Sequence, residues 1–316
     1  MLNTIIFIIA GIILLYKGAE WLVGSSARFA QHLHVSRVII GLTVIAIGTS
    51  LPELMTSMIG ALQGSPDVAL GNILGSNMAN IGLVLAIAVI IKPIRSHIED
   101  IYRDGPWLVL GAVLLLILAL DGNLSRIDGL ILFIFSLVFF TFIVSQVHKS
   151  RMIEEDKLPF QEFKIKARDR RRNIVLIAFG LASLIMGAQL LIVGALDLAA
   201  LFNAPELLIG LTIVALGTSL PELAASAWSA IHGKAEVTLG NVIGSNIANI
   251  FLVLGLVAIV SPIAISQRAT QIDIPILVVY TILVILLIRT REKLTRGEGV
   301  LLLVIYLTYI IWSFVY

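Results

Sequence analysis

The sequence predicts an all-α integral membrane protein with ten transmembrane helices, arranged in two inverted-topology five-helix repeats. Three observations predict this fold class: apolar runs along the whole chain, an internal repeat at one fixed offset, and basic residues gathered in alternate connecting segments. Of the 316 residues, 59% are hydrophobic and only 13% are charged. A soluble globular domain usually carries about 25% charged residues, so this composition is typical of a helical membrane protein.

Ten segments are long and apolar enough to be membrane spans, since a spanning helix needs roughly 20 predominantly apolar residues. We expect them at about residues 2–22, 38–62, 68–92, 105–121, 126–148, 173–195, 207–231, 237–260, 272–289 and 299–316. The first is expected to be a retained span, because no basic stretch precedes it and no small-residue cleavage site follows it. A β-barrel is not expected, because its strands would appear as shorter alternating segments.

The chain contains an internal repeat. Residues 41–85 reappear as residues 210–254 with an offset of 169, and 27 of these 45 positions are identical. This repeat divides the chain into a first half at 1–148, a linker at 149–172 and a second half at 173–316. Each half holds five expected spans, and an odd number of spans turns the second repeat upside down relative to the first.

The placement of basic residues tests this topology independently, because cytoplasmic loops carry an excess of Lys and Arg. If the 149–172 linker is cytoplasmic, 19 of the 22 Lys and Arg residues lie in cytoplasmic segments. Both termini then face outward, in a multi-pass protein of the plasma or inner membrane. The linker is too short to be a folded regulatory domain. We interpret it as a solvated connector, and the basic cluster within residues 168–172 as a topology signal or a contact with lipid head groups.

Several function classes find no support in the sequence. There are no cysteines, which excludes disulfides and thiolate metal sites. The five histidines are scattered without ligand spacing, and no phosphate-binding loop, catalytic triad or nucleic-acid signature is present. We therefore expect neither an enzyme nor a resident cofactor, no nucleic-acid partner, and no obligatory protein partner.

Two acidic residues, Glu53 and Glu222, lie near the middle of the predicted spans 38–62 and 207–231. Ionisable groups at this depth are costly and are functional candidates by default. Each glutamate follows a proline, whose missing N–H predicts a kinked or broken helix with freed carbonyls facing an interior site.

Other oxygen-bearing groups share the helix face of each glutamate. In the first half these are Thr49, Ser50 and the carbonyl of Ala46, which lie one or two turns before Glu53. The second half copies them as Thr218, Ser219 and Ala215. The following span of each half adds a serine and an asparagine one turn apart: Ser76 and Asn80, and Ser245 and Asn249.

These groups form a set of oxygen ligands with two carboxylates, which suits hard cations such as Ca²⁺ and Na⁺. The alternatives are a mutually satisfied structural pair for the glutamates, and bonds back to the helix or between helices for the hydroxyls. Four further asparagines are interpreted as helix–helix contacts: Asn72, Asn77, Asn241 and Asn246. Four glycines are expected to give their helices close-packing faces: Gly71, Gly75, Gly240 and Gly244.

Each half carries the segments Gly-Thr-Ser-Leu-Pro-Glu and Gly-Asn-x-x-Gly-Ser-Asn-x-x-Asn. These pairs resemble the two alpha-repeats of the sodium/calcium exchanger family, and the whole chain resembles its compact prokaryotic members. The resemblance implies that Glu53 and Glu222 are the central cation ligands, and that the hydroxyls and amides named above join them. It also implies that the carbonyls of Ala46 and Ala215 complete sodium sites, and suggests that the first and sixth spans slide against the bundle.

The chain departs from some archaeal relatives at Asn249, where they have Asp. The site then holds two acids instead of three, which argues against a potassium-dependent subtype and leaves the balance among Na⁺, H⁺ and Ca²⁺ open. Our hypothesis is a sodium/calcium antiporter that works by alternating access at a midplane site. A proton-driven calcium antiporter of the same fold is the main alternative. A channel and a membrane-embedded enzyme are weaker ones.

Overall fold

The computed structural model describes residues 2–33, 37–95, 98–155, 167–201, 215–291 and 293–315. In the first half the elements are α1 (Leu2–Leu33), α2 (Arg37–Ile40), η1 (Gly41–Ile45), α3 (Ala46–Thr49), α4 (Leu51–Leu62), α5 (Pro66–Ala79), η2 (Asn80–Leu85), α6 (Ala86–Ile91), β1 (Ile94–Arg95), α7 (Ile98–Leu118), β2 (Asn123–Leu124) and α8 (Arg126–Glu155). In the second half they are α9 (Ala167–Leu201), α11 (Ala215–Thr218), α12 (Leu220–Ile231), α13 (Ala235–Ile247), η4 (Ala248–Leu254), α14 (Gly255–Val260), β3 (Ile263–Ala264), η5 (Ala269–Asp273), α15 (Ile274–Arg291), β4 (Lys293–Leu294) and α16 (Arg296–Val315). The elements written η are π-helical, with a wider turn than an α-helix.

The all-helical fold expected from the sequence is confirmed, and the described residues add four strands of two residues each. Among the described residues, seven helices are long and apolar enough to cross a membrane, and the bent pair Val38–Thr49 and Leu51–Leu62 makes an eighth span. Two predicted spans are not in this count. One is α7, whose first turns are charged, and the other is the seventh, of which residues 207–214 lie outside the described part of the chain.

Several helices extend beyond the predicted spans. Helix α7 begins at Ile98, whereas the predicted span begins at 105. Its added turns contain Arg103 and Asp104, whose side chains bond to each other through two N–O contacts of 2.6 Å. Helix α8 continues to Glu155 and α9 starts at Ala167, so both ends of the predicted linker are helical. Apolarity marks the part of a helix that suits the bilayer, whereas the backbone bonds continue into polar residues beyond it.

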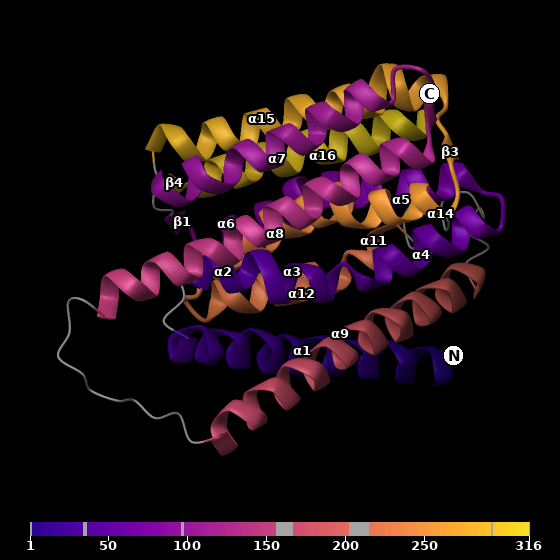
Figure 1. Ribbon diagram of the computed structural model, residues 1–316. Coiled ribbons are helices and arrows are strands. Elements are labelled where there is room, and N and C mark those ends of the chain that lie inside the picture. Colours follow the sequence, from indigo (N-terminus) through magenta and orange to yellow (C-terminus); the bar gives the residue numbers. More distant parts are fainter. Residues whose placement is uncertain are drawn as a thin grey trace.

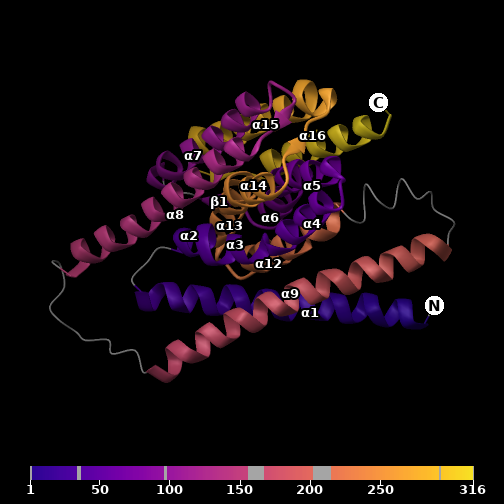
Figure 2. The same cartoon turned by 45° about the vertical axis from the view of Figure 1, so that its right-hand side comes forward.

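The helices form three layers (Figures 1 and 2). The long helices α1 and α9 lie against each other on one side, and α12 connects them to the centre. The centre holds the short helices α3, α4 and α12 together with α5 and α13. The helices α7, α8, α15 and α16 cover the other side. Both chain ends lie at the same end of the bundle, opposite the end where α8 leaves and α9 enters (Figure 1).

Glycines let α1 and α9 approach closely. A Cβ added to Gly18 would lie 2.9 Å from the carbonyl oxygen of Gly180, and one added to Gly187 would lie 2.9 Å from that of Gly11. The four glycines obey the repeat, because Gly11 and Gly18 correspond to Gly180 and Gly187 at the offset of 169. Small residues at such crossings let two helix backbones come into contact.

The strand pairs show the relation between the halves. Strand β1 pairs antiparallel with β4, and β2 pairs antiparallel with β3. An offset of 169 residues carries β1 onto β3, and an offset of 170 carries β2 onto β4. One ribbon is therefore the repeat equivalent of the other, and each joins the two halves. This exchange of partners is what a two-fold relation between inverted repeats requires.

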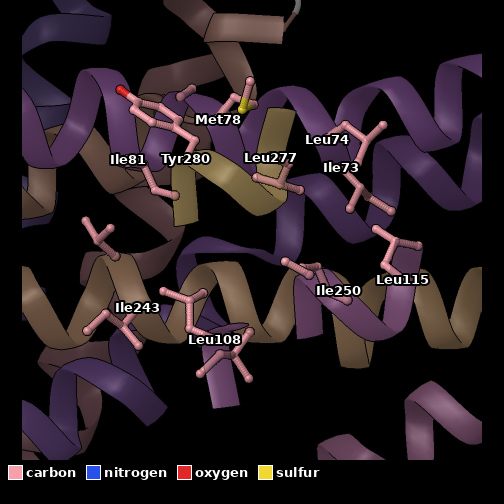
Figure 3. Close-up of a cluster of buried hydrophobic side chains, with 14 of the residues drawn as sticks. Ile73, Leu74, Met78, Ile81, Leu108, Leu115, Ile243, Ile250, Leu277 and Tyr280 are labelled. Atoms are coloured by element: carbon pink, nitrogen blue, oxygen red, sulfur yellow. The ribbon is translucent and has the colours of Figure 1, made fainter. Parts of the chain in front are cut away.

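The side of α5 and α13 that faces α7 and α15 is apolar. Figure 3 shows this cluster, which includes Ile73, Leu74, Met78, Ile81, Ile243, Ile250, Leu108, Leu115, Leu277 and Tyr280. Its side chains are almost fully buried. Polar residues of the same helices contact the other repeat: Ser76, Asn77, Asn80, Ser245, Asn246 and Asn249.

The expected close packing of Gly240 and Gly244 is confirmed. A Cβ at either position would clash with the backbone of the segment 38–42: one on Gly240 with the carbonyl oxygen of Val38, and one on Gly244 with that of Leu42 at 2.6 Å. The repeat equivalents of that segment, near 207–211, lie outside the described residues. The matching prediction for Gly71 and Gly75 therefore stays a prediction.

Candidate cation site between the repeats

The span that carries each glutamate is broken at a serine, three residues before the glutamate, and a new helix starts directly after that serine. Ser50 has φ −82° and ψ 4°, and Ser219 has φ −87° and ψ 3°, which separates α3 from α4 and α11 from α12. Pro52 and Pro221 fall in the first turn of the new helix, where a missing N–H costs no hydrogen bond. The first break bends the chain by 40°. The predicted kinks are confirmed, and they place a helix N-terminus at each glutamate.

Glu53 and Glu222 are both completely buried. None of their four carboxyl oxygens has a hydrogen-bond partner in the part of the chain that the structure describes. The two carboxyls lie close enough to interact electrostatically, and the Ser76 hydroxyl neighbours Glu53. The hydroxyls of Thr49 and Ser50 neighbour Glu222. Each carboxyl thus faces hydroxyls of the first repeat, and the two glutamates do not satisfy each other as a structural pair would.

Threonine hydroxyls connect the two repeats around these carboxyls. Thr49 Oγ1 lies 3.4 Å from Oδ1 of Asn241, and Thr218 Oγ1 lies 3.2 Å from Oδ1 of Asn72. The two contacts are repeat equivalents. Thr218 Oγ1 also lies 3.5 Å from Ser76 Oγ. A hydroxyl that donates its single hydrogen keeps lone pairs, so these oxygens can still bind a cation.

Some hydroxyls also bind back to their own helix, as the alternative interpretation expected. Thr49 Oγ1 lies 3.1 Å from the carbonyl oxygen of Ile45. The serines at the breaks differ, because Ser50 Oγ and Ser219 Oγ are buried and have no hydrogen-bond partner among the described residues. Both have oxygen lone pairs available next to a glutamate.

The carbonyl of Ala46 is not freed by the helix break. It accepts the N–H of Ser50 at 3.0 Å and lies 3.5 Å from the Ser245 hydroxyl of the other repeat. The expectation of an opened carbonyl is therefore wrong here, because the chain keeps its α-helical bond up to Ser50. Thr49 Oγ1 also lies 3.4 Å from this oxygen, so a cation bound there would take the place of the two long hydroxyl contacts. Ala215 begins α11, and the residues before it lie outside the described part of the chain.

The interpretation of Asn72 and Asn241 as helix–helix contacts is confirmed. Asn72 Nδ2 donates to the carbonyl oxygen of Glu53 at 3.2 Å and to Ser57 Oγ at 2.9 Å. Asn241 Nδ2 donates to Ser226 Oγ at 3.1 Å. Ser57 and Ser226 are not among the residues predicted from the sequence. Their signal is the spacing, because each lies one helical turn after a glutamate.

Asn80 and Asn249 lie in the π-helical segments η2 and η4. Each bonds across the repeat interface: Asn80 Nδ2 lies 3.5 Å from Asn246 Oδ1, and Asn249 Nδ2 lies 3.2 Å from Asn77 Oδ1. Every proposed side-chain ligand is thus buried at the boundary between the two halves: Glu53, Glu222, Thr49, Ser50, Ser76, Asn80, Thr218, Ser219, Ser245 and Asn249.

Inverted repeats with buried carboxyls between them are typical of membrane transporters. Comparison with known proteins gives the family. The family model described as sodium/calcium exchanger protein matches residues 3–145 and 172–315, so the chain belongs to this family.

Two curated relatives cover essentially the full chain. The sodium/calcium exchanger MaX1 of Methanosarcina acetivorans is 30% identical, over 98% of both chains. The inner membrane protein YrbG of Escherichia coli is 34% identical, over 99% of this chain and 98% of its own. A solved structure of the sodium-calcium exchanger NCX_Mj, soaked with Na⁺ and Sr²⁺, superimposes with a TM-score of 0.86 at 33% identity, over 98% of both chains. The match supports the ten-helix inverted-repeat fold of a multi-pass membrane protein.

Proposed function

We propose that the protein exchanges Na⁺ for Ca²⁺ across the cell membrane, by alternating access to the site around Glu53 and Glu222. One observation carries the proposal: two fully buried carboxyls from opposite repeats have no described protein partner and are surrounded by oxygens. Uncompensated carboxylates in a low-dielectric interior are costly, by several kcal/mol each on most scales. A bound cation removes this cost.

The chemistry of the proposed ligands favours Ca²⁺ and Na⁺ over softer metals. All the ligands are oxygens, and Ca²⁺ takes about 6–8 oxygen ligands. Two carboxylates balance the charge of one Ca²⁺. The names of MaX1 and NCX_Mj describe these relatives as sodium/calcium exchangers, which supports the same pair of substrates for this chain.

The exchange follows from competition for shared oxygens. Na⁺ and Ca²⁺ use overlapping ligands around Glu53 and Glu222, so one kind of ion occupies the site at a time. A loaded site is close to neutral and can be carried through the switch between inward and outward orientations, whereas two bare carboxylates resist it. The glycine-lined pair of α1 and α9, attached to the centre mainly through α12, is proposed to slide during this switch.

Competition can be measured on the purified protein in detergent. Bound radioactive calcium is followed while NaCl replaces choline chloride at constant ionic strength. We expect Na⁺ to displace Ca²⁺ with a sigmoidal dependence, because more than one Na⁺ is needed to balance two carboxylates. Displacement by protons alone, with no effect of Na⁺, would favour the proton-driven antiporter.

A further inference from the structure

Four buried asparagines form a cluster between the repeats, which we call the asparagine quartet: Asn77, Asn80, Asn246 and Asn249. Each is at most 1% exposed. The first two come from the α5–η2 helix and the other two from the α13–η4 helix. The offset of 169 carries the first pair onto the second, and the two hydrogen bonds between them are equivalent.

The donors in these bonds are Asn80 and Asn249, and the acceptors are Asn246 and Asn77. Four amide atoms of the quartet are buried and have no partner among the described residues: the Oδ1 atoms of Asn80 and Asn249, and the Nδ2 atoms of Asn77 and Asn246. A side-chain amide carries its oxygen and its N–H₂ group on opposite sides. Fixing the Nδ2 atom on a neighbour therefore turns the oxygen away from that neighbour.

The free oxygens belong to the two amides that are proposed to bind the cation. Asn80 lies one helical turn after Ser76, whose hydroxyl neighbours the carboxyl of Glu53. Asn249 stands in the same relation to Ser245 in the other repeat. Reversing the amides of a pair would keep one bond but leave an N–H₂ group in place of the free oxygen. A cation favours the oxygen, because the N–H₂ group is the positive end of the amide.

We propose that Asn77 and Asn246 are positioning residues: each accepts the amide N–H of a ligand from the other repeat and so directs that ligand's oxygen toward the cation. This inference rests on the proposed cation site and extends it to two residues that do not touch the ion. It also assigns a reason for the π-helical turns at η2 and η4. The wider turn starts at or next to the ligand asparagine in each repeat, and π-turns inside α-helices often occur at functional sites.

The amide chemistry provides a diagnostic test at Asn249. An amide needs a partner that selects its oxygen end, whereas a carboxylate has an oxygen at both ends. Asn77 should therefore matter while residue 249 is Asn, and should become dispensable in the Asn249→Asp background. A merely structural role for Asn77 would cost the same in both backgrounds.

The experiment measures Ca²⁺ binding by calorimetry for the full-length protein in detergent. The four proteins are the wild type, Asn77→Ala, Asn249→Asp and the double variant. We expect Asn77→Ala to raise the Ca²⁺ dissociation constant about three- to tenfold in the wild-type background, which corresponds to one net hydrogen bond. In the Asn249→Asp background we expect the same substitution to leave the constant unchanged. Equal factors in the two backgrounds, or no effect in the first, would overturn the proposal.

Two additions keep the result interpretable. If Asn77→Ala does not give a monodisperse protein, Asn77→Leu removes the acceptor while keeping the volume, and the same comparison applies. The equivalent pair, Asn246→Ala with and without Asn80→Asp, must behave in the same way. Glu53→Gln and Glu222→Gln test the cation site itself. If both bind Ca²⁺ like the wild type, the proposed function fails, whereas their loss of binding together with equal factors for Asn77→Ala refutes only the positioning role.

Discussion

Glu53 and Glu222 carry the whole formal charge of the proposed site, because the other proposed ligands are hydroxyls, amides and backbone carbonyls. Their carboxyls are completely buried and lie beside hydroxyls, with no hydrogen bond of standard length and angle to any described residue. Removing one charge leaves a site that cannot balance a divalent ion. These two residues therefore determine whether the proposed site can balance a divalent cation.

We expect Glu53→Gln and Glu222→Gln each to abolish calcium transport and to leave a folded, membrane-inserted protein. Glutamine keeps the shape and one oxygen of the side chain but loses the charge that attracts Ca²⁺. Radioactive calcium uptake into proteoliposomes and size-exclusion profiles measure the two properties. Glu20→Gln is the matched control, because Glu20 is exposed, pairs with Lys17 and lies outside the site. Wild-type uptake by either site variant would make its carboxyl purely structural.

The residues of the site differ in how far the sequence could predict them. The glutamates stand out because charge inside an apolar span needs a reason. Ser57 and Ser226 do not stand out, because a serine in a span is most often a local bond, and only the fold brings each to a helix-bridging asparagine. The carbonyl of Ala46 keeps its helical bond, because proline removes the N–H partner of Gly48 but leaves the N–H of Ser50 in place, and its role in a sodium site stays a prediction.

At the scale of elements, the helix breaks follow from a serine and a proline that the sequence shows. The π-helical turns follow from packing between the repeats, which the sequence does not show. The π-helical turns at η2 and η4 have no pattern of their own in the sequence, because their residues are as apolar as those of a regular helix. They lie where the asparagines bond across the repeats. The sequence prediction also starts α7 too late, because the first turns of this helix are polar and carry no apolar pattern that marks a span.

The close approach of α1 and α9 gives a prediction for Gly180. A Cβ there would lie 2.6 Å from the backbone nitrogen of Leu22, so Gly180→Leu must push the helices apart. Overpacking of this kind typically costs about 1–3 kcal/mol. We expect a lower melting temperature and slower calcium uptake, measured by thermal unfolding in detergent and by flux. Gly297→Ala is the control, because nothing described lies within 4 Å of a Cβ there, and it should behave like the wild type. A Gly180→Leu protein with unchanged melting and flux would contradict the tight crossing.

At the scale of the whole molecule, the repeat at offset 169 anticipated the architecture well. The same offset relates the glycines of α1 and α9, the Asn–Thr contacts at the site and the asparagine quartet. The sequence did not predict the exchange of strands between β1–β4 and β2–β3, because two-residue strands have no periodicity to detect. The repeat therefore predicts how the two halves are arranged, whereas the strand pairs that connect them depend on packing.

The proposed orientation places both termini outside and residues 149–172 in the cytoplasm. The absence of cysteine makes this testable with single introduced cysteines. In intact cells, a membrane-impermeant maleimide should label Asn3→Cys, near the N-terminus. Ser150→Cys, in the linker, should react only after the cells are permeabilised. The opposite labelling pattern would mean that the molecule is inserted the other way round.

The central claim is that Na⁺ provides the drive for calcium movement. It is tested most directly with the purified protein in proteoliposomes, by measuring radioactive calcium uptake while outwardly directed Na⁺, K⁺ and H⁺ gradients are imposed one at a time. Our account predicts uptake with the Na⁺ gradient alone, and none in Glu53→Gln. Uptake driven by the H⁺ gradient and indifferent to Na⁺ would contradict it.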